Sequence, residues 1–146
     1  MSLIAMRSMT ANVLLDTNVL VYALVVRTGA VVDPRNKTAW DLVAAGGRVS
    51  VQALAEFTDV VSRKHKKNWE TIAEMLDGIR VLCGPALPLT AEIHTSAIEV
   101  SQRYGYRIYD SMMIVAALSA GCTTLFTEDM QHGQLIDGLC IENPFL

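Results

Sequence analysis

Charged residues are scarce in this 146-residue sequence: they make up 18% of it and leave a net charge of −3. A chain with this balance does not attract nucleic acid over its whole surface, so any such contact requires a local basic patch or bound metal ions. Hydrophobic residues make up 51%, which excludes a disordered chain and predicts a compact fold. The length is that of one ordinary domain.

Cysteines are also few, and long apolar runs are absent. Cys83, Cys122 and Cys140 are an odd number without paired spacing, so the sequence predicts neither a disulfide framework nor a zinc site. The longest uncharged run, 111–127, is too short and too polar for a membrane span. Residues 1–11 carry no pattern, and we expect a flexible N-terminal segment there, followed by a single domain over 12–146. We expect a cytoplasmic protein without a membrane segment.

Short apolar runs alternate with longer helical patterns along the rest of the chain. This alternation is typical of βαβ units and predicts a single α/β domain with a central, mostly parallel sheet of four or five short strands and helices on both faces. The expected strands are 12–15, 49–51, 124–126 and 139–141, with at most a short edge strand within 81–89. The expected helices are 16–26, 34–45, 51–66, 69–78, 91–105 and 110–120.

Four acids border apolar segments. Asp16 and Asp129 each follow a predicted strand, Asp110 opens an apolar helix, and Glu56 lies at the edge of an apolar helical stripe. Taken singly, each has an ordinary interpretation: Asp16 and Asp110 as helix N-caps, Glu56 as a solvated flank and Asp129 as loop polarity. Function in open α/β sheets gathers at the carboxyl ends of strands, where these acids would meet. Clustered, half-buried carboxylates repel one another unless a cation is present, and oxygen-only ligands favour Mg²⁺ or Mn²⁺.

The same residues carry a family resemblance. The sequence resembles the PIN-domain ribonucleases, and more specifically the VapC-type toxins of toxin–antitoxin pairs, from about Val13 to the end. Four segments match the family's motifs in order and separation: "LLDTNVLVYAL", "SVQALAEF", "IYDSMMIVAAL" and "LFTEDMQHG". Ser111 takes the place of the alanine that is more usual after the third acid.

The resemblance implies a PIN-like nuclease domain and a Mg²⁺- or Mn²⁺-dependent endoribonuclease, in which water attacks the RNA phosphodiester. Its implied catalytic and metal-binding residues are Asp16, Glu56, Asp110 and Asp129. Asn18 and Thr127 match positions that support the site by hydrogen bonding, and Glu128 leaves open which of the two neighbouring acids faces the metal. The implied partners are an RNA substrate, a cognate antitoxin protein and a second copy of the chain in a homodimer.

Basic residues gather in "SRKHKK", 62–67, at the end of the helix that carries Glu56. Arg63, Lys64, Lys66 and Lys67 have an ordinary interpretation, in which they complement the helix dipole, and a functional one, in which they steer phosphates toward the acids. Arg107 and Arg103, shortly before the third acid, are further candidates for contact with RNA.

Two other functions fit parts of the sequence. One is a phosphatase of the haloacid-dehalogenase type with Asp16 as nucleophile, although that family expects a second acid where this chain has Asn18. The other is a PIN-like fold without catalysis that serves as a binding module. His65, His94 and His132 lie in unrelated settings, and we expect them at the surface.

Overall fold

The computed structural model describes residues 12–26 and 31–146. The predicted flexible segment 1–11 lies outside the described residues. The described elements are β1 (Val13–Leu15), α2 (Thr17–Leu24), α3 (Arg35–Ala44), α4 (Val51–Arg63), α5 (Trp69–Cys83), α6 (Ala91–Tyr104), α7 (Ile108–Ser119), β2 (Thr124–Phe126), β3 (Leu135–Ile136) and β4 (Leu139–Glu142). None of the helices in these ranges has the length and apolar character needed to cross a membrane.

The strands form one sheet in the order β1-β2-β4-β3. β1 pairs with β2 and β2 with β4 in parallel, and β3 closes the edge as an antiparallel hairpin with β4. The predicted mostly parallel sheet is therefore confirmed. β3 was not predicted, because two residues of which only Ile136 is buried leave no readable pattern.

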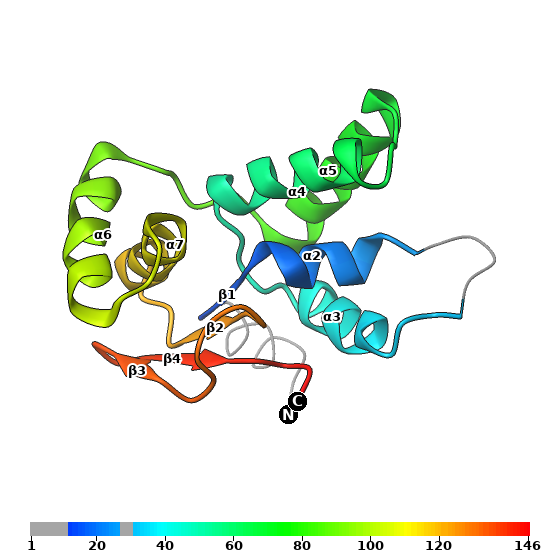
Figure 1. Cartoon of the computed structure of the whole chain (residues 1–146). Coiled ribbons are helices and arrows are strands. Elements are labelled where there is room, and N and C mark those ends of the chain that lie inside the picture. Colours follow the sequence, from blue (N-terminus) through cyan, green and yellow to red (C-terminus); the bar gives the residue numbers. More distant parts are fainter. Residues whose placement is uncertain (1–11, 27–30) are drawn as a thin grey trace.

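Helices flank this sheet on both sides, as expected. Figure 1 shows α6 and α7 on one side of β1, and α2, α3, α4 and α5 on the other. α7 packs against α6 and against β2 and β4, whereas α2 packs against α3 and α4. The first strand is buried along its whole length, which is the reason that its sequence is apolar without alternation.

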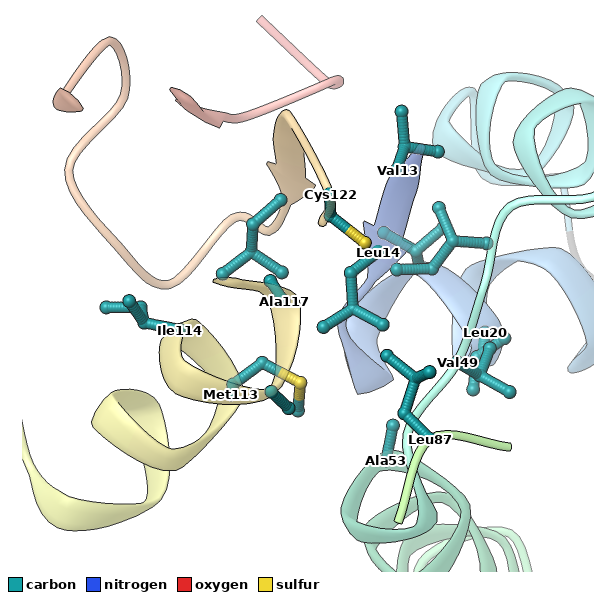
Figure 2. Close-up of a cluster of buried hydrophobic side chains, with 14 of the residues drawn as sticks. Val13, Leu14, Leu20, Val49, Ala53, Leu87, Met113, Ile114, Ala117 and Cys122 are labelled. Atoms are coloured by element: carbon teal, nitrogen blue, oxygen red, sulfur yellow. The ribbon is translucent and has the colours of Figure 1, made fainter. Parts of the chain in front are cut away.

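The core lies where β1 meets α7 and the segments around Val49 and Leu87. Figure 2 shows Leu14 close to Ala117 of α7, with Val49 and Leu87 beside each other above α4. Leu14 and Val49 are fully buried. The backbone of Leu87 binds on both sides of residue 50, donating to the Val49 carbonyl at 2.9 Å and accepting from the Val51 amide at 2.8 Å. This core fixes the amino end of α4, the helix that carries Glu56.

Three local predictions were wrong. Residues 49–51 are not a strand: Arg48 and Ser50 form isolated bridges, and Val51 begins α4 with Ser50 as its N-cap. α5 does not end at Gly78 but continues to Cys83, because burial of later residues such as Ile79 outweighs the roughly 1 kcal/mol cost of a helical glycine. The other boundaries differ from the prediction by a few residues.

The third error concerns the helix at the third acid. Asp110 does not cap α7, since the N-cap position is Arg107 and Asp110 lies in the first turn. The ordinary interpretation of Asp110 as an N-cap is therefore excluded. Its carboxylate still lies close to the positive end of the helix dipole, which favours the charged form.

Candidate active site

The site begins at the carboxyl ends of β1 and β2. The parallel register pairs Leu15 with Phe126, so the next residue of each strand, Asp16 and Thr127, lies at the same edge of the sheet. The Thr127 hydroxyl donates to Oδ2 of Asp16 at 2.7 Å, and the Asp16 amide donates to the Phe126 carbonyl at 3.0 Å. Both side chains are buried, with 6% of Asp16 and none of Thr127 exposed. The two strand ends therefore form one polar cluster inside an apolar fold.

Asp16 is also a helix N-cap, as its ordinary interpretation predicted. Its Oδ1 accepts the Thr17 amide of α2 at 2.7 Å. The cap does not account for its environment, because burial raises the pKa of Asp16 to about 6. Hydrogen bonds from Thr127 and Thr17 lower the pKa, while the charges of Glu56 and Asp129 raise it further. The two hydrogen bonds therefore offset only part of the cost of a charged carboxylate at Asp16.

Asn18 links the two strand ends to the fourth acid. Its Nδ2 lies 3.1 Å from Oδ2 of Asp129, 3.3 Å from Oγ1 of Thr127 and 3.5 Å from Oδ2 of Asp16. Its Oδ1 is buried and has no hydrogen-bond partner. The amide thus faces the acids with its donor group.

Glu56 reaches the same cluster from α4. Its Oε2 accepts the Thr17 hydroxyl at 2.8 Å, and its Oε1 accepts Nε2 of Gln52 at 3.0 Å. The Gln52 amide also donates to the carbonyl of Tyr109 at 2.9 Å, which joins α4 to the first turn of α7. Gln52 was missed by the sequence analysis; its only sequence signal is its place one turn before Glu56 on the same helix face.

Asp110 is held in the first turn of α7 beside Arg107. Burial raises the pKa of Asp110, the neighbouring Arg107 guanidinium lowers it, and the charges of Asp129 and Glu56 raise it. The next residue, Ser111, is fully buried and accepts a 2.7 Å hydrogen bond from Ser101 of α6. The serine at this position therefore helps to hold α7 against α6 and does not disturb the acid.

The two neighbouring acids after β2 have different surroundings. The Tyr22 hydroxyl donates to Oε1 of Glu128 at 2.7 Å, and Arg35 lies 3.6 Å from its Oε2. The Arg35 guanidinium also lies over the Tyr22 ring, 4.2 Å from its centroid. Asp129 instead contacts Asn18. Of the two acids, Asp129 is therefore the one whose carboxylate joins the cluster with Asp16.

All four predicted acids line one cavity of about 350 Å³, together with Thr17, Gln52, Arg107, Tyr109 and Met113. No histidine lines this cavity. Within 12–26 and 31–146, no group of three or more His, Cys, Asp and Glu side chains lies close enough to hold one metal ion by direct contact alone. The four acids therefore line one cavity but do not form a compact set of direct metal ligands.

The predicted basic residues do not gather at one site. Arg107 lines the acidic cavity, and Lys64, the C-cap residue of α4, lines the adjoining one. Arg63 is paired with Asp59 at 3.4 Å. Lys66 and Lys67 are exposed in the turn after α4, and Arg103 lies over the Tyr104 ring on α6.

Fold and site together define an α/β protein with an acidic cavity at the ends of adjacent parallel strands. The PIN domain family model matches residues 13–135, a range that includes all four acids, and the chain belongs to this family. The crystal structure of Mycobacterium tuberculosis VapC20, a Sarcin-Ricin loop cleaving toxin, is similar with a TM-score of 0.56. The match covers 80% of this chain and 91% of that chain at 18% identity, which shows a shared fold. No curated protein matches the sequence. The predicted PIN-domain resemblance is thus confirmed.

Proposed function

We propose that this protein is a metal-dependent endoribonuclease and the toxin of a type II toxin–antitoxin pair, with its nuclease site in a single domain over 12–146. The observation that carries the proposal is the gathering of Asp16, Glu56, Asp110 and Asp129 around one cavity. Membership of the PIN domain family and the fold shared with a toxin that cleaves the Sarcin-Ricin loop support it.

The donor set fits Mg²⁺ or Mn²⁺. The acids offer carboxylate oxygens, which hard divalent cations prefer, and neither cysteine nor histidine lines the cavity. Mg²⁺ keeps several of its waters and binds through one or two carboxylates, so an open arrangement of acids suits it. A cation there would also offset the repulsion that Glu56 and Asp129 exert on buried Asp16. Asp16 and Asp110 would hold the ion, with Glu56 and Asp129 completing the site.

When bound, the metal supplies a binding point for the scissile phosphate and a water of lowered pKa. The chain's own residues prepare this chemistry. Thr17, by its backbone amide, and Thr127, by its hydroxyl, fix both oxygens of Asp16. Glu56, held by Thr17 and Gln52, would accept a proton from the attacking water at its carboxylate. Attack by water on the phosphorus leaves a 5′-phosphate and a 3′-hydroxyl.

The phosphatase alternative is disfavoured by the surroundings of Asp16. Asn18 stands where that family expects a second acid, and it donates to the cluster instead of acting as an acid.

The same proposal includes binding partners for this protein. A nuclease toxin must be held inactive in its host, and we propose a small cognate antitoxin as the inhibitor and a homodimer as the toxin's own assembly. The RNA that is cut is proposed as a structured molecule whose single-stranded loop enters the cavity, since sequence-specific RNA recognition targets such loops.

The test of this proposal uses purified protein free of partner and a structured RNA containing single-stranded loops. Cleavage is expected with Mg²⁺ or Mn²⁺ and none with excess chelator, and the new ends should carry 5′-phosphate and 3′-hydroxyl. Trapping of a phosphorylated aspartate at Asp16 would support the phosphatase instead. RNA binding without cleavage in either metal would support the non-catalytic binding module.

A further inference from the structure

A second cavity of about 640 Å³ adjoins the acidic one. Thr17, Glu56 and Asp129 line both, so the two cavities meet along the acids and form one groove, whose lining comes from α2, α4, the start of α7 and the residues after β2. Each part is within the roughly 300–1,000 Å³ range of small-ligand sites, which suits an unstacked nucleotide and is too small for a duplex. The groove therefore extends beyond the four acids, and this far part is not needed for the cleavage reaction itself.

Each of the two parts of this groove is lined by a basic residue. Arg107 lines the acidic part and Lys64 lines the far part. Asp59 and Glu128 also line the far part, but Asp59 is paired with Arg63 and Glu128 with Arg35, which leaves Lys64 as a positive charge facing the groove there. A chain of phosphates that crosses the acids would thus meet a positive charge before and after them.

The walls of the groove are suited to bases. Val21, Ala55 and Val60 line the far part between the acids and Lys64. Beside Arg107, Tyr109 lines the acidic part and is 55% exposed as a residue, and its backbone carbonyl accepts a hydrogen bond from Gln52. An exposed aromatic residue next to a cation is suited to stack on a base of a single-stranded nucleic acid.

We propose that this groove is the path of a single RNA strand. One base stacks on Tyr109 with its phosphate at Arg107, the next phosphodiester lies at the acids, and the strand continues over the apolar wall to Lys64. The inference rests on the proposed ribonuclease function. It adds the course of the strand and two residues, Tyr109 and Lys64, that bind RNA without taking part in the chemistry.

The experiment measures anisotropy of a fluorescent, mixed-sequence single-stranded RNA octamer with Mg²⁺ present. Asp110→Asn serves as the parent protein so that the strand is not cut. Tyr109→Ala is expected to weaken binding at least about fivefold through loss of stacking, while Tyr109→Phe keeps the ring and stays within about twofold of the parent. Lys64→Gln is expected to reduce the slope of log Kd against log salt by about 0.7, the value for one phosphate contact on a single strand.

Matched controls come from outside the groove. Lys37 is an exposed lysine of α3 paired with Asp41, and Trp69 is an exposed aromatic residue at the start of α5. Lys37→Gln and Trp69→Ala should leave both affinity and salt slope at the parent values. A duplex of the same sequence should bind more weakly than the single strand.

The proposal is overturned if the parent does not bind the octamer, if the duplex binds as tightly, or if Tyr109→Ala and Lys64→Gln match the controls. Cleavage by the wild-type protein is measured separately. If the wild-type protein cleaves RNA but the variants bind the octamer as tightly as the parent, the strand takes another path and the ribonuclease function stands. The expected binding pattern without cleavage in any metal means that the groove binds RNA but the proposed function fails.

Discussion

Thr127 donates a hydrogen bond to Oδ2 of Asp16 at 2.7 Å, although the two residues lie 111 positions apart in the sequence. The bond joins the carboxyl ends of β1 and β2 and holds the most deeply buried of the four acids. The same hydroxyl accepts the Asp129 amide at 3.1 Å. One threonine therefore sets the relative positions of two acids that come from opposite ends of the chain.

We expect Thr127→Val to destabilise the fold in a pH-dependent manner. The substitution keeps the shape but removes a buried hydroxyl, which costs about 1–3 kcal/mol. The Thr127 hydrogen bond lowers the pKa of Asp16, so its loss raises that pKa further and penalises the charged form. Urea unfolding in chelator should therefore show a larger loss at pH 7.5 than at pH 4, where Asp16 is protonated in both proteins. Equal losses at both pH values would mean that the bond does not stabilise the carboxylate.

We expect Asp16→Asn to be more stable than wild type in chelator at neutral pH. Burial raises the folded-state pKa of Asp16 to about 6 from its ordinary value of 3.8. Between these pH values the unfolded chain loses the proton that the folded chain keeps, so wild-type stability falls as pH rises and levels off above about 6. The loss is roughly 3 kcal/mol at 1.36 kcal/mol per pKa unit. Asn keeps the cap, so the advantage of the variant should be present at pH 7.5 and vanish near pH 4.

The same pair of proteins tests metal binding by melting with manganese. At about ten times the dissociation constant, binding adds about 1.4 kcal/mol to wild-type stability, or a few degrees of melting temperature. The variant should gain less, because it lacks the central carboxylate. An equal shift of both proteins, or a variant that melts clearly lower in chelator, would remove Asp16 from the proposed metal site.

Glu128 and Asp129 should differ in their effect on metal affinity. The Glu128 carboxylate is held by Tyr22 and Arg35, whereas Asp129 lines the acidic cavity. Isothermal titration with Mn²⁺ should therefore show at least about a tenfold loss for Asp129→Asn. Glu128→Gln keeps an acceptor for Tyr22 and should lose less than about threefold. The reverse order would show that Glu128 turns toward the metal when it binds.

The chain is expected to form a homodimer in solution. The prediction rests on the resemblance to PIN-domain toxins, and the high apolar content of the sequence is compatible with an interface. Light scattering at micromolar concentration should give twice the 16.0 kDa mass of one chain. A single-chain mass over the whole micromolar range would contradict the expected assembly.

The cluster of acids could be predicted because it depends on simple rules of sheets. A buried strand that ends in a polar residue has a readable pattern, and adjacent parallel strands place such ends together. Asp16 and Thr127 follow this rule, and the register of β1 and β2 confirms it. Glu56 was found because its helix carries an apolar stripe whose border the acid marks.

Other features depend on contacts between distant segments, which no local pattern encodes. Whether Glu128 or Asp129 joins the cluster is decided by Tyr22 and Arg35, more than ninety positions earlier in the chain. Gln52 acts through the backbone of Tyr109, 57 residues away. The extension of α5 past Gly78 likewise results from tertiary burial that overrides local propensity.

The most direct test of the proposed site is the single-turnover cleavage rate of wild type and Asp110→Asn with Mg²⁺ on the same structured RNA. Asp110 is the suitable position because it is not the N-cap of α7, so the variant removes a charge without removing a cap. Circular dichroism and melting should show that the variant is folded. We expect the rate to fall at least about a hundredfold, equivalent to roughly 2.7 kcal/mol of barrier, and wild-type cleavage to stop in chelator. A folded Asp110→Asn variant that cuts at the wild-type rate, or wild-type cleavage that continues in chelator, would contradict a nuclease site built from these four acids.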